Sequence, residues 1–193
     1  MLISNKSKPT SFDKWQSILV AIDDNFMDEV FKTCFYTTQD TSIQWLQFRI
    51  LHRIIPVGYY LKKIKIKATD ICNFGQSDSE TIEHLFYECP LVNFLWKLLS
   101  DYLNYTCNLN ISFSLIDVIF GKTNNSENLC INLIILWTKQ YIFLCSKTSK
   151  LPFFSSLKSA LTFKFKTEKY SWSRRNRIDQ FNNYCNVVEK AFE

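Results

Sequence analysis

The chain has 193 residues and a net charge of +5, and its 47% of hydrophobic residues suits one domain with a real core rather than wholesale disorder. Its three glycines exclude a Gly-rich phosphate loop, and its two histidines leave little material for a His-based triad. With only four prolines as well, the chain has room for long helices and is unlike a turn-rich β-sandwich.

The predicted elements are almost entirely helices. In chain order, hydrophobic residues at three- and four-residue steps predict helices over residues 12–36, 41–54, 80–88, 91–104, 114–120, 127–147, 153–169 and about 174–192. Between the second and third, Pro56 opens the segment 57–66, in which alternating residues allow a short strand. The expected fold class is therefore all-α, a compact multi-helix domain with at most one short strand pair near residues 64–75.

Several helix ends carry signals of their own. We expect Ser11 to cap the first helix, Thr41 or Ser42 to cap the second, and Gly121 to end the helix at 114–120. The helix over 127–147 is mostly apolar but interrupted by polar residues, so we expect a central buried helix rather than a membrane span. The organisation that follows is an N-terminal tail over 1–11, a helical domain over 12–150 and a basic helical extension over 151–193.

The seven cysteines are an odd number, which suits a disulfide framework poorly. The N-terminus also lacks the apolar run of a secretory signal, so we expect an intracellular protein, cytoplasmic or nuclear, with reduced thiols. The cysteines are then either buried apolar residues or metal ligands. Four cysteines lie on predicted helices and are expected to pack as apolar side chains, namely Cys34, Cys130, Cys145 and Cys185.

The charge is unevenly distributed along the chain. Residues 44–75 hold six basic residues and one acidic residue, and residues 151–177 hold seven basic and one acidic. Between them, residues 76–90 hold four acidic residues and no basic one. Two basic blocks favour binding to a polyanion at two places, although lysines and arginines also simply solvate helix faces.

One group of residues has metal-ligand spacing: Cys72, His84 and Cys89. A structural zinc site takes four ligands, commonly a Cys-x2-Cys knuckle and a helical pair, and this group supplies three. Asp78, Glu80 or the later Cys107 would be candidates for a fourth. The alternative is that the two cysteines are small buried hydrophobic residues and the histidine a core histidine. No HExxH motif supports a catalytic metal.

The residues around this group carry a family resemblance. The stretch from about Ile43 to Leu98 resembles the zinc-binding module that follows the polymerase domain of LINE-type (non-LTR) retrotransposon reverse transcriptases. The matching runs are WLQFRILHRIIP, LKKIKIKATDICNF, ETIEHLFYECP and FLWKLL. Cys72, Thr81, His84, Cys89 and Trp96 match the family pattern in order. Weaker similarity downstream extends the resemblance over roughly residues 12–185.

The resemblance implies zinc as the cofactor, held by Cys72, His84 and Cys89 in a zinc-knuckle-like segment over residues 70–97. The chain departs from the pattern at the second cysteine of the knuckle, because CNFGQ reads like CNFCGQ with one cysteine deleted and Gly75 in its place. We therefore expect zinc to bind more weakly than at a complete site, or not at all.

A polymerase active site is not expected in this chain. The run Ile22-Asp23-Asp24 is similar to the paired aspartates that bind magnesium in reverse transcriptases, but Ala21 stands where that motif has an aromatic residue. Only 22 residues precede the pair, which is too few for a catalytic palm. We interpret the aspartates as part of a solvated helix face and expect no enzymatic activity.

The function implied by the family is binding of template RNA or target DNA. The basic blocks support it, since cations attract backbone phosphates and exposed rings such as Tyr59 and Tyr60 stack on bases. The candidate contact residues are Arg49, Arg53, Lys62, Lys63, Lys65 and Lys67 in the first block, and Lys164, Lys166, Arg174, Arg175 and Arg177 in the second.

Two functions remain open from the sequence. The first is a non-catalytic nucleic-acid-binding accessory module of a LINE-type reverse transcriptase, with an RNA or DNA backbone and the polymerase part of a longer retroelement protein as partners and no membrane. The second is a structural or protein-interaction helical domain, or a decayed retroelement fragment, that binds neither metal nor nucleic acid. In the second case, exposed aromatics such as Phe153 and Phe154 would contact a partner.

Overall fold

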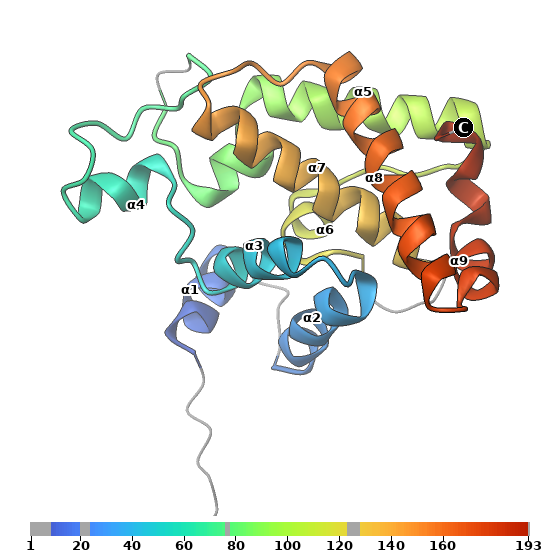
Figure 1. Cartoon of the computed structure of the whole chain (residues 1–193). Helices are drawn as coiled ribbons and strands as arrows, with labels where there is room; N and C mark the ends of the chain where they lie inside the picture. Colours follow the sequence, from blue (N-terminus) through green and yellow to red (C-terminus); the bar gives the residue numbers. More distant parts are fainter. Residues whose placement is uncertain (1–8, 20–23, 76–77, 123–127, 193) are drawn as a thin grey trace, which may run out of the picture.

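The computed structural model describes residues 9–19, 24–75, 78–122 and 128–192 (Figure 1). Of the run Ile22-Asp23-Asp24, Ile22 and Asp23 lie outside these residues, as does most of the predicted tail over 1–11. The elements are α1 (Thr10–Ile18), α2 (Asp24–Thr37), α3 (Thr41–Leu51), α4 (Gly58–Lys63), the π-helical turn η1 (His84–Glu88), α5 (Pro90–Cys107), α6 (Leu115–Phe120), α7 (Leu129–Lys147), α8 (Phe154–Arg174), α9 (Ile178–Cys185) and the 3-10 helix η3 (Asn186–Ala191).

The predicted all-α class is confirmed, because no strand occurs among the described residues. The strand pair allowed near residues 64–75 is reduced to one isolated antiparallel bridge between Ile71 and Ser79. Gly121 ends α6 with a positive φ of 88°, and its N–H donates to the carbonyl of Asp117 as expected. At the start of α3 the cap is Asp40, whose side chain accepts from the N–H of Ser42, so the predicted caps Thr41 and Ser42 are wrong.

Helix α7 is the centre of the core, as predicted. It packs against α2, α3, α6, α8, α9 and η1, and its central place among the helices is visible in Figure 1. Its residues from Cys130 to Lys139 are all buried. By length and composition α7 could cross a membrane, but 72% of its most apolar 18-residue window is buried inside the protein. The buried ammonium of Lys139 donates to the side-chain carbonyl of Gln47 and to the backbone carbonyl of Ile119, which offsets its desolvation.

The single helix predicted over residues 12–36 is wrong. Helix α1 ends at Ile18, Leu19 is extended, and α2 begins at Asp24. The break allows Trp15 and Phe26 to pack edge-on against the same ring, Phe120, at centroid distances of 5.2 and 5.5 Å. In one continuous helix these two residues would lie about 16 Å apart along the axis, too far to share a neighbour. The expected cap Ser11 is also wrong, since α1 begins one residue earlier, after Pro9.

The C-terminal helices also differ from the prediction. Helix α8 runs on to Arg174, five residues past its predicted end, and the predicted helix over about 174–192 is instead α9 followed by η3. Asn176 takes a positive φ of 55° where the chain reverses. This turn brings Phe181 and Phe192 onto the ring of Phe165, at 5.3 and 5.0 Å. The packing of these three rings stabilises the chain reversal between α8 and α9.

Candidate metal centre

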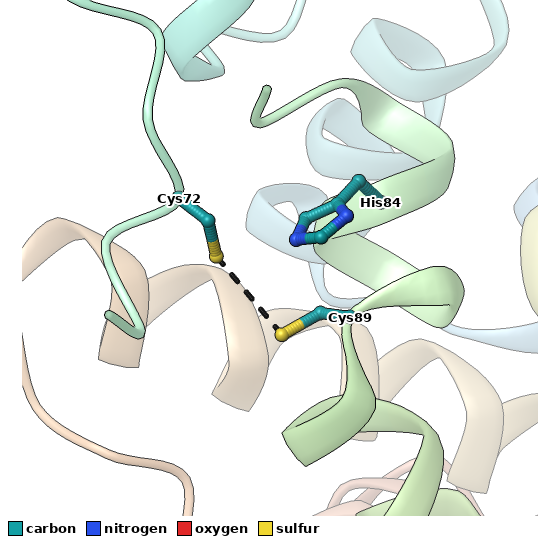
Figure 2. A group of neighbouring side chains, drawn as sticks. All are labelled: Cys72, His84 and Cys89. Carbon is teal, nitrogen blue, oxygen red and sulfur yellow. Dashed lines mark hydrogen bonds between the residues drawn. The ribbon is translucent and has the colours of Figure 1, made fainter. Parts of the chain in front are cut away.

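Cys72, His84 and Cys89 converge in space (Figure 2). One ligand atom from each residue lies within 4.8 Å of the other two, and the two sulfurs are 4.0 Å apart. A tetrahedral zinc with Zn–S bonds of about 2.3 Å would hold two sulfurs about 3.8 Å apart. The three side chains are buried, so the structure brings the predicted ligands together at a spacing close to that of a zinc site.

The π-helical turn places His84 and Cys89 on one side of the chain. The residues are five apart, and in an α-helix that spacing would rotate them roughly 140° away from each other. Here the N–H of Cys89 donates to the carbonyl of His84 at 2.9 Å, a bond across five residues that widens the turn. The α-helical geometry expected for residues 84–88 is thus wrong, and the wider turn is what aligns the two ligands.

The start of this turn is held from both sides. The N–H of His84 donates to the hydroxyl of Thr81 at 3.0 Å. The indole of Trp96, on α5, donates to the carbonyl of Phe86 at 2.8 Å, and its ring packs against Phe113. Thr81 and Trp96 are two of the positions that match the family pattern, and both of them position the ligand-bearing turn.

Cys72 reaches the site from the loop between α4 and η1, which a buried carboxylate anchors. Glu80 is 1% exposed and accepts hydrogen bonds from the N–H of Gly58 (2.8 Å), the N–H of Asn73 (3.3 Å) and the hydroxyl of Ser146 (3.1 Å). These bonds tie the loop to the start of α4 and to the end of α7. Glu80, a candidate metal ligand by its position in the sequence, thus anchors the loop instead, a role that its sequence position does not reveal.

The imidazole of His84 is incompletely satisfied. The residue is 5% exposed, and its Nε2 has no hydrogen-bond partner among the described residues. A buried nitrogen without a partner is costly, and a metal ion is one of the groups that can satisfy it. A donor set of two thiols and an imidazole is typical of zinc, so the residues fit the metal.

The two thiols share one environment. The hydrogen bond from Cys72, assisted by the nearby backbone N–H groups of Val92 and Leu91, outweighs burial and lowers the pKa of Cys89 to about 6. The same contact, together with burial, raises the pKa of Cys72. The pair therefore loses a first proton easily and a second one reluctantly, because two adjacent thiolates repel each other unless a cation lies between them.

None of the candidate fourth ligands completes the site in the described part of the chain. Glu80 is occupied by three donors, and Asp78 is exposed and lies outside the cluster. Cys107 lies at the far end of α5, about 27 Å along the helix axis from Cys89. At Gly75 the φ is +80° and a Cβ atom would meet nothing within 4 Å, so the position of the expected second knuckle cysteine is an open turn.

The remaining described cysteines are consistent with apolar packing. Cys130, Cys145 and Cys185 are buried, and Cys107 is partly buried; none of these is in a disulfide. Burial raises the pKa of the Cys130 and Cys145 thiols. The side chain of Cys34 lies outside the described residues.

The first basic block is divided between exposed and paired side chains. Arg53 forms an ion pair with Glu83, and its guanidinium lies 4.2 Å from the ring centroid of Trp15. Lys62 pairs with Asp70 at 2.7 Å, and Lys67 donates to Asn73 at 3.3 Å. Arg49, Lys63 and Lys65 are exposed and have no ion-pair partner among the described residues.

The second block is divided in the same way. Lys164 pairs with Asp40 at 3.0 Å, and Lys169 pairs with Glu189. Exposed cations without a partner in the described ion pairs are Lys166, Arg174, Arg175 and Arg177. Of these, Arg174, Arg175 and Arg177 lie at the C-terminal end of α8, where they also complement the negative end of the helix dipole.

Comparison with known proteins supports the metal-binding character of the first half of the chain. A family model described as zinc-binding in reverse transcriptase matches residues 14–96, a segment that contains the three candidate ligands and Trp96. A search of curated proteins finds no match. Residues 14–96 are thus similar to the accessory zinc-binding segment of a reverse transcriptase.

Proposed function

We propose that the chain is a non-catalytic accessory module of a LINE-type reverse transcriptase, which binds zinc through Cys72, His84 and Cys89 and holds template RNA or target DNA. The observation that carries the proposal is the buried Cys-His-Cys cluster, with its unpartnered histidine nitrogen, inside the segment that matches the family model. The module would act inside the cell, in the cytoplasm or the nucleus, as part of a longer retroelement protein.

Zinc would link three parts of the fold. Cys72 belongs to the loop anchored by Glu80, His84 to the π-helical turn and Cys89 to the start of α5 (Figure 2). The ion would neutralise the two thiolates and satisfy the histidine nitrogen. With three protein ligands, the fourth position would fall to water or to an added group, and the affinity would be below that of a four-ligand site.

Nucleic-acid binding is supported by the surface beside the knuckle. A hollow of about 480 Å³ lies between α1 and α4, and its walls include Lys14, Lys63, Tyr59 and Tyr60. Cations on the rim attract phosphates, and the tyrosine rings offer faces to unpaired bases. Lys65, two residues after Lys63 in the chain, is exposed as well.

Two measurements on the purified chain test the proposal. The first is metal content, for which we expect about one zinc per chain that is lost in Cys89→Ser and kept in Cys107→Ser. The second is binding to RNA and DNA across a salt series, for which we expect affinity to fall steeply as salt increases. A flat response to salt, or no binding at low salt, would contradict the nucleic-acid role, and absence of zinc would contradict the metal site.

The competing function is a protein-interaction domain, and one feature favours it. Phe153 is exposed just before α8, while its neighbour Phe154 packs edge-on against Tyr102 at 5.8 Å. Of these two phenylalanines, only Phe153 is thus exposed to a partner. If the chain binds neither zinc nor nucleic acid, this interpretation stands.

A further inference from the structure

Trp45 is an aromatic residue with no place in the core. It lies on the outer side of α3, whose buried side chains Ile43, Leu46 and Ile50 pack inward, and it is 58% exposed. Three of the other tryptophans are buried and the fourth is partly buried. The indole packs edge-on against Phe48 at a centroid distance of 5.4 Å, and more than half of its surface remains exposed to a ligand.

The indole stands between two hollows in the surface. One, of about 250 Å³, is lined by Thr41, Gln44, Phe48 and Trp45. The other, of about 450 Å³, lies between α3 and α7, with Trp45, Arg49, Gln140 and Phe143 on its walls. Helices α3 and α7 lie side by side (Figure 1). A flat ring thus has room for another flat ring in each of two neighbouring spaces.

The surroundings of Trp45 are positively charged. Neither α3 nor α7 contains an aspartate or a glutamate. Arg49 is exposed on the wall of the larger hollow, and the ammonium of Lys147 lies 5.1 Å from the ring centroid of Phe143 on the same wall. The nearest carboxylate in the sequence, Asp40, is already paired with Lys164. The charge around the indole therefore complements a polyanion and opposes a basic peptide.

We propose that Trp45 is a stacking platform for an unpaired base, with Arg49 on the adjoining phosphate, so that α3 and α7 hold a single-stranded stretch of nucleic acid. This rests on the proposed nucleic-acid role and adds the form of the strand and the residues that contact it. The ligand is single-stranded because an aromatic side chain stacks readily only on bases that are free of a duplex partner. Base–aromatic stacking tolerates any sequence, so this contact needs no base-reading side chain.

The test is the binding of the full chain to a fluorescein-labelled single-stranded RNA, measured by anisotropy for the wild type and three variants. Trp45→Ala is expected to bind about tenfold more weakly, and Trp45→Phe within about threefold of the wild type, because a phenyl ring still stacks. The salt dependence of Trp45→Ala stays unchanged because the indole carries no charge. The control is Tyr105→Ala, which removes an aromatic side chain that is 93% exposed at the far end of α5.

The outcomes separate this inference from the proposed function. If the wild type binds RNA and Trp45→Ala binds equally well, the stacking platform is refuted and the proposed function survives. If the wild type binds no nucleic acid at all, both are refuted. Self-association of the wild type that Trp45→Ala abolishes would overturn the inference in favour of a protein interface. Equal loss in Tyr105→Ala would likewise overturn it, since the effect would not belong to Trp45.

Discussion

The carbonyl oxygen of His84 accepts a hydrogen bond from the N–H of Cys89 at 2.9 Å. This bond closes a π-helical turn, which places the side chains of the two candidate ligands on the same side of the chain. The five-residue spacing of His84 and Cys89 is visible in the sequence, but only the π-helical turn brings their side chains close together. Cys72 then completes the cluster from a loop that a buried carboxylate anchors, with its sulfur 4.0 Å from that of Cys89.

Zinc should stabilise the chain through this cluster. We expect the melting temperature to fall when zinc is removed with a chelator, because the ion links the loop at Cys72 to the start of α5. Calorimetry of the wild type with and without chelator measures the shift. Cys89→Ser should show no chelator effect, whereas Cys107→Ser, about 27 Å away along α5, should behave like the wild type. An equal chelator effect in Cys89→Ser would contradict the site.

Glu80 should be important for stability although it is not a ligand. Glu80→Ala leaves the N–H groups of Gly58 and Asn73 and the hydroxyl of Ser146 without their acceptor, at an expected cost of about 3 kcal/mol in the free energy of unfolding. Urea denaturation measures this cost. The control is Glu88→Ala, whose carboxylate is exposed at the end of η1 and should change the free energy by less than about 0.5 kcal/mol. Similar midpoints for both variants would refute the anchoring role.

Glu168 should make the stability of the fold depend on pH. Burial raises the pKa of this carboxyl group, and the hydrogen bond from the indole of Trp172 only partly opposes the shift. Because the pKa of Glu168 is higher in the folded state than in the unfolded state, protonation of this residue favours the folded state. Its contribution to the free energy of unfolding is complete below pH 4.5, the ordinary pKa of a glutamate, and is lost as the pH rises through the folded-state pKa.

Glu168→Gln keeps an acceptor for Trp172 and removes the titration. We expect this variant to lose less stability than the wild type between pH 4.5 and pH 7 and to be more stable than the wild type at pH 7. Urea midpoints across this range, measured with chelator present, provide the comparison. Parallel pH profiles for the two proteins would show that Glu168 is not the group responsible.

The basic residues of the first block should separate into two classes. Lys63→Gln and Lys65→Gln remove exposed cations, so each should lower the slope of log affinity against log salt by about 1 without affecting the fold. Arg53→Gln leaves the buried carboxylate of Glu83 unpaired and should destabilise the fold by about 3 kcal/mol. Salt titrations and urea melts of the three variants check both statements. An unchanged fold in Arg53→Gln would show that the ion pair with Glu83 is dispensable.

The helical class and the clustering of Cys72, His84 and Cys89 could be predicted because both depend on local pattern. Residues such as Ile43, Leu46 and Ile50 recur at helical steps and are indeed buried on one face of α3. The Cys-His-Cys spacing and the matching positions Thr81 and Trp96 likewise lie within one short stretch of chain. Cys107 is wrong as a candidate ligand because α5 carries it about 27 Å along the helix axis away from Cys89.

The sequence by itself determined which residues carry chemistry: three metal-type donors, two basic blocks and an all-α pattern, since composition and periodicity are properties of the chain alone. Only the tertiary structure decided which of them are available. Arg53 is paired with Glu83. Glu80 is hydrogen-bonded to Gly58, Asn73 and Ser146. The break after Ile18 allows Trp15 and Phe26 to pack against the same ring, Phe120. The physical reason is that burial and pairing arise from contacts between distant segments, which local patterns do not encode.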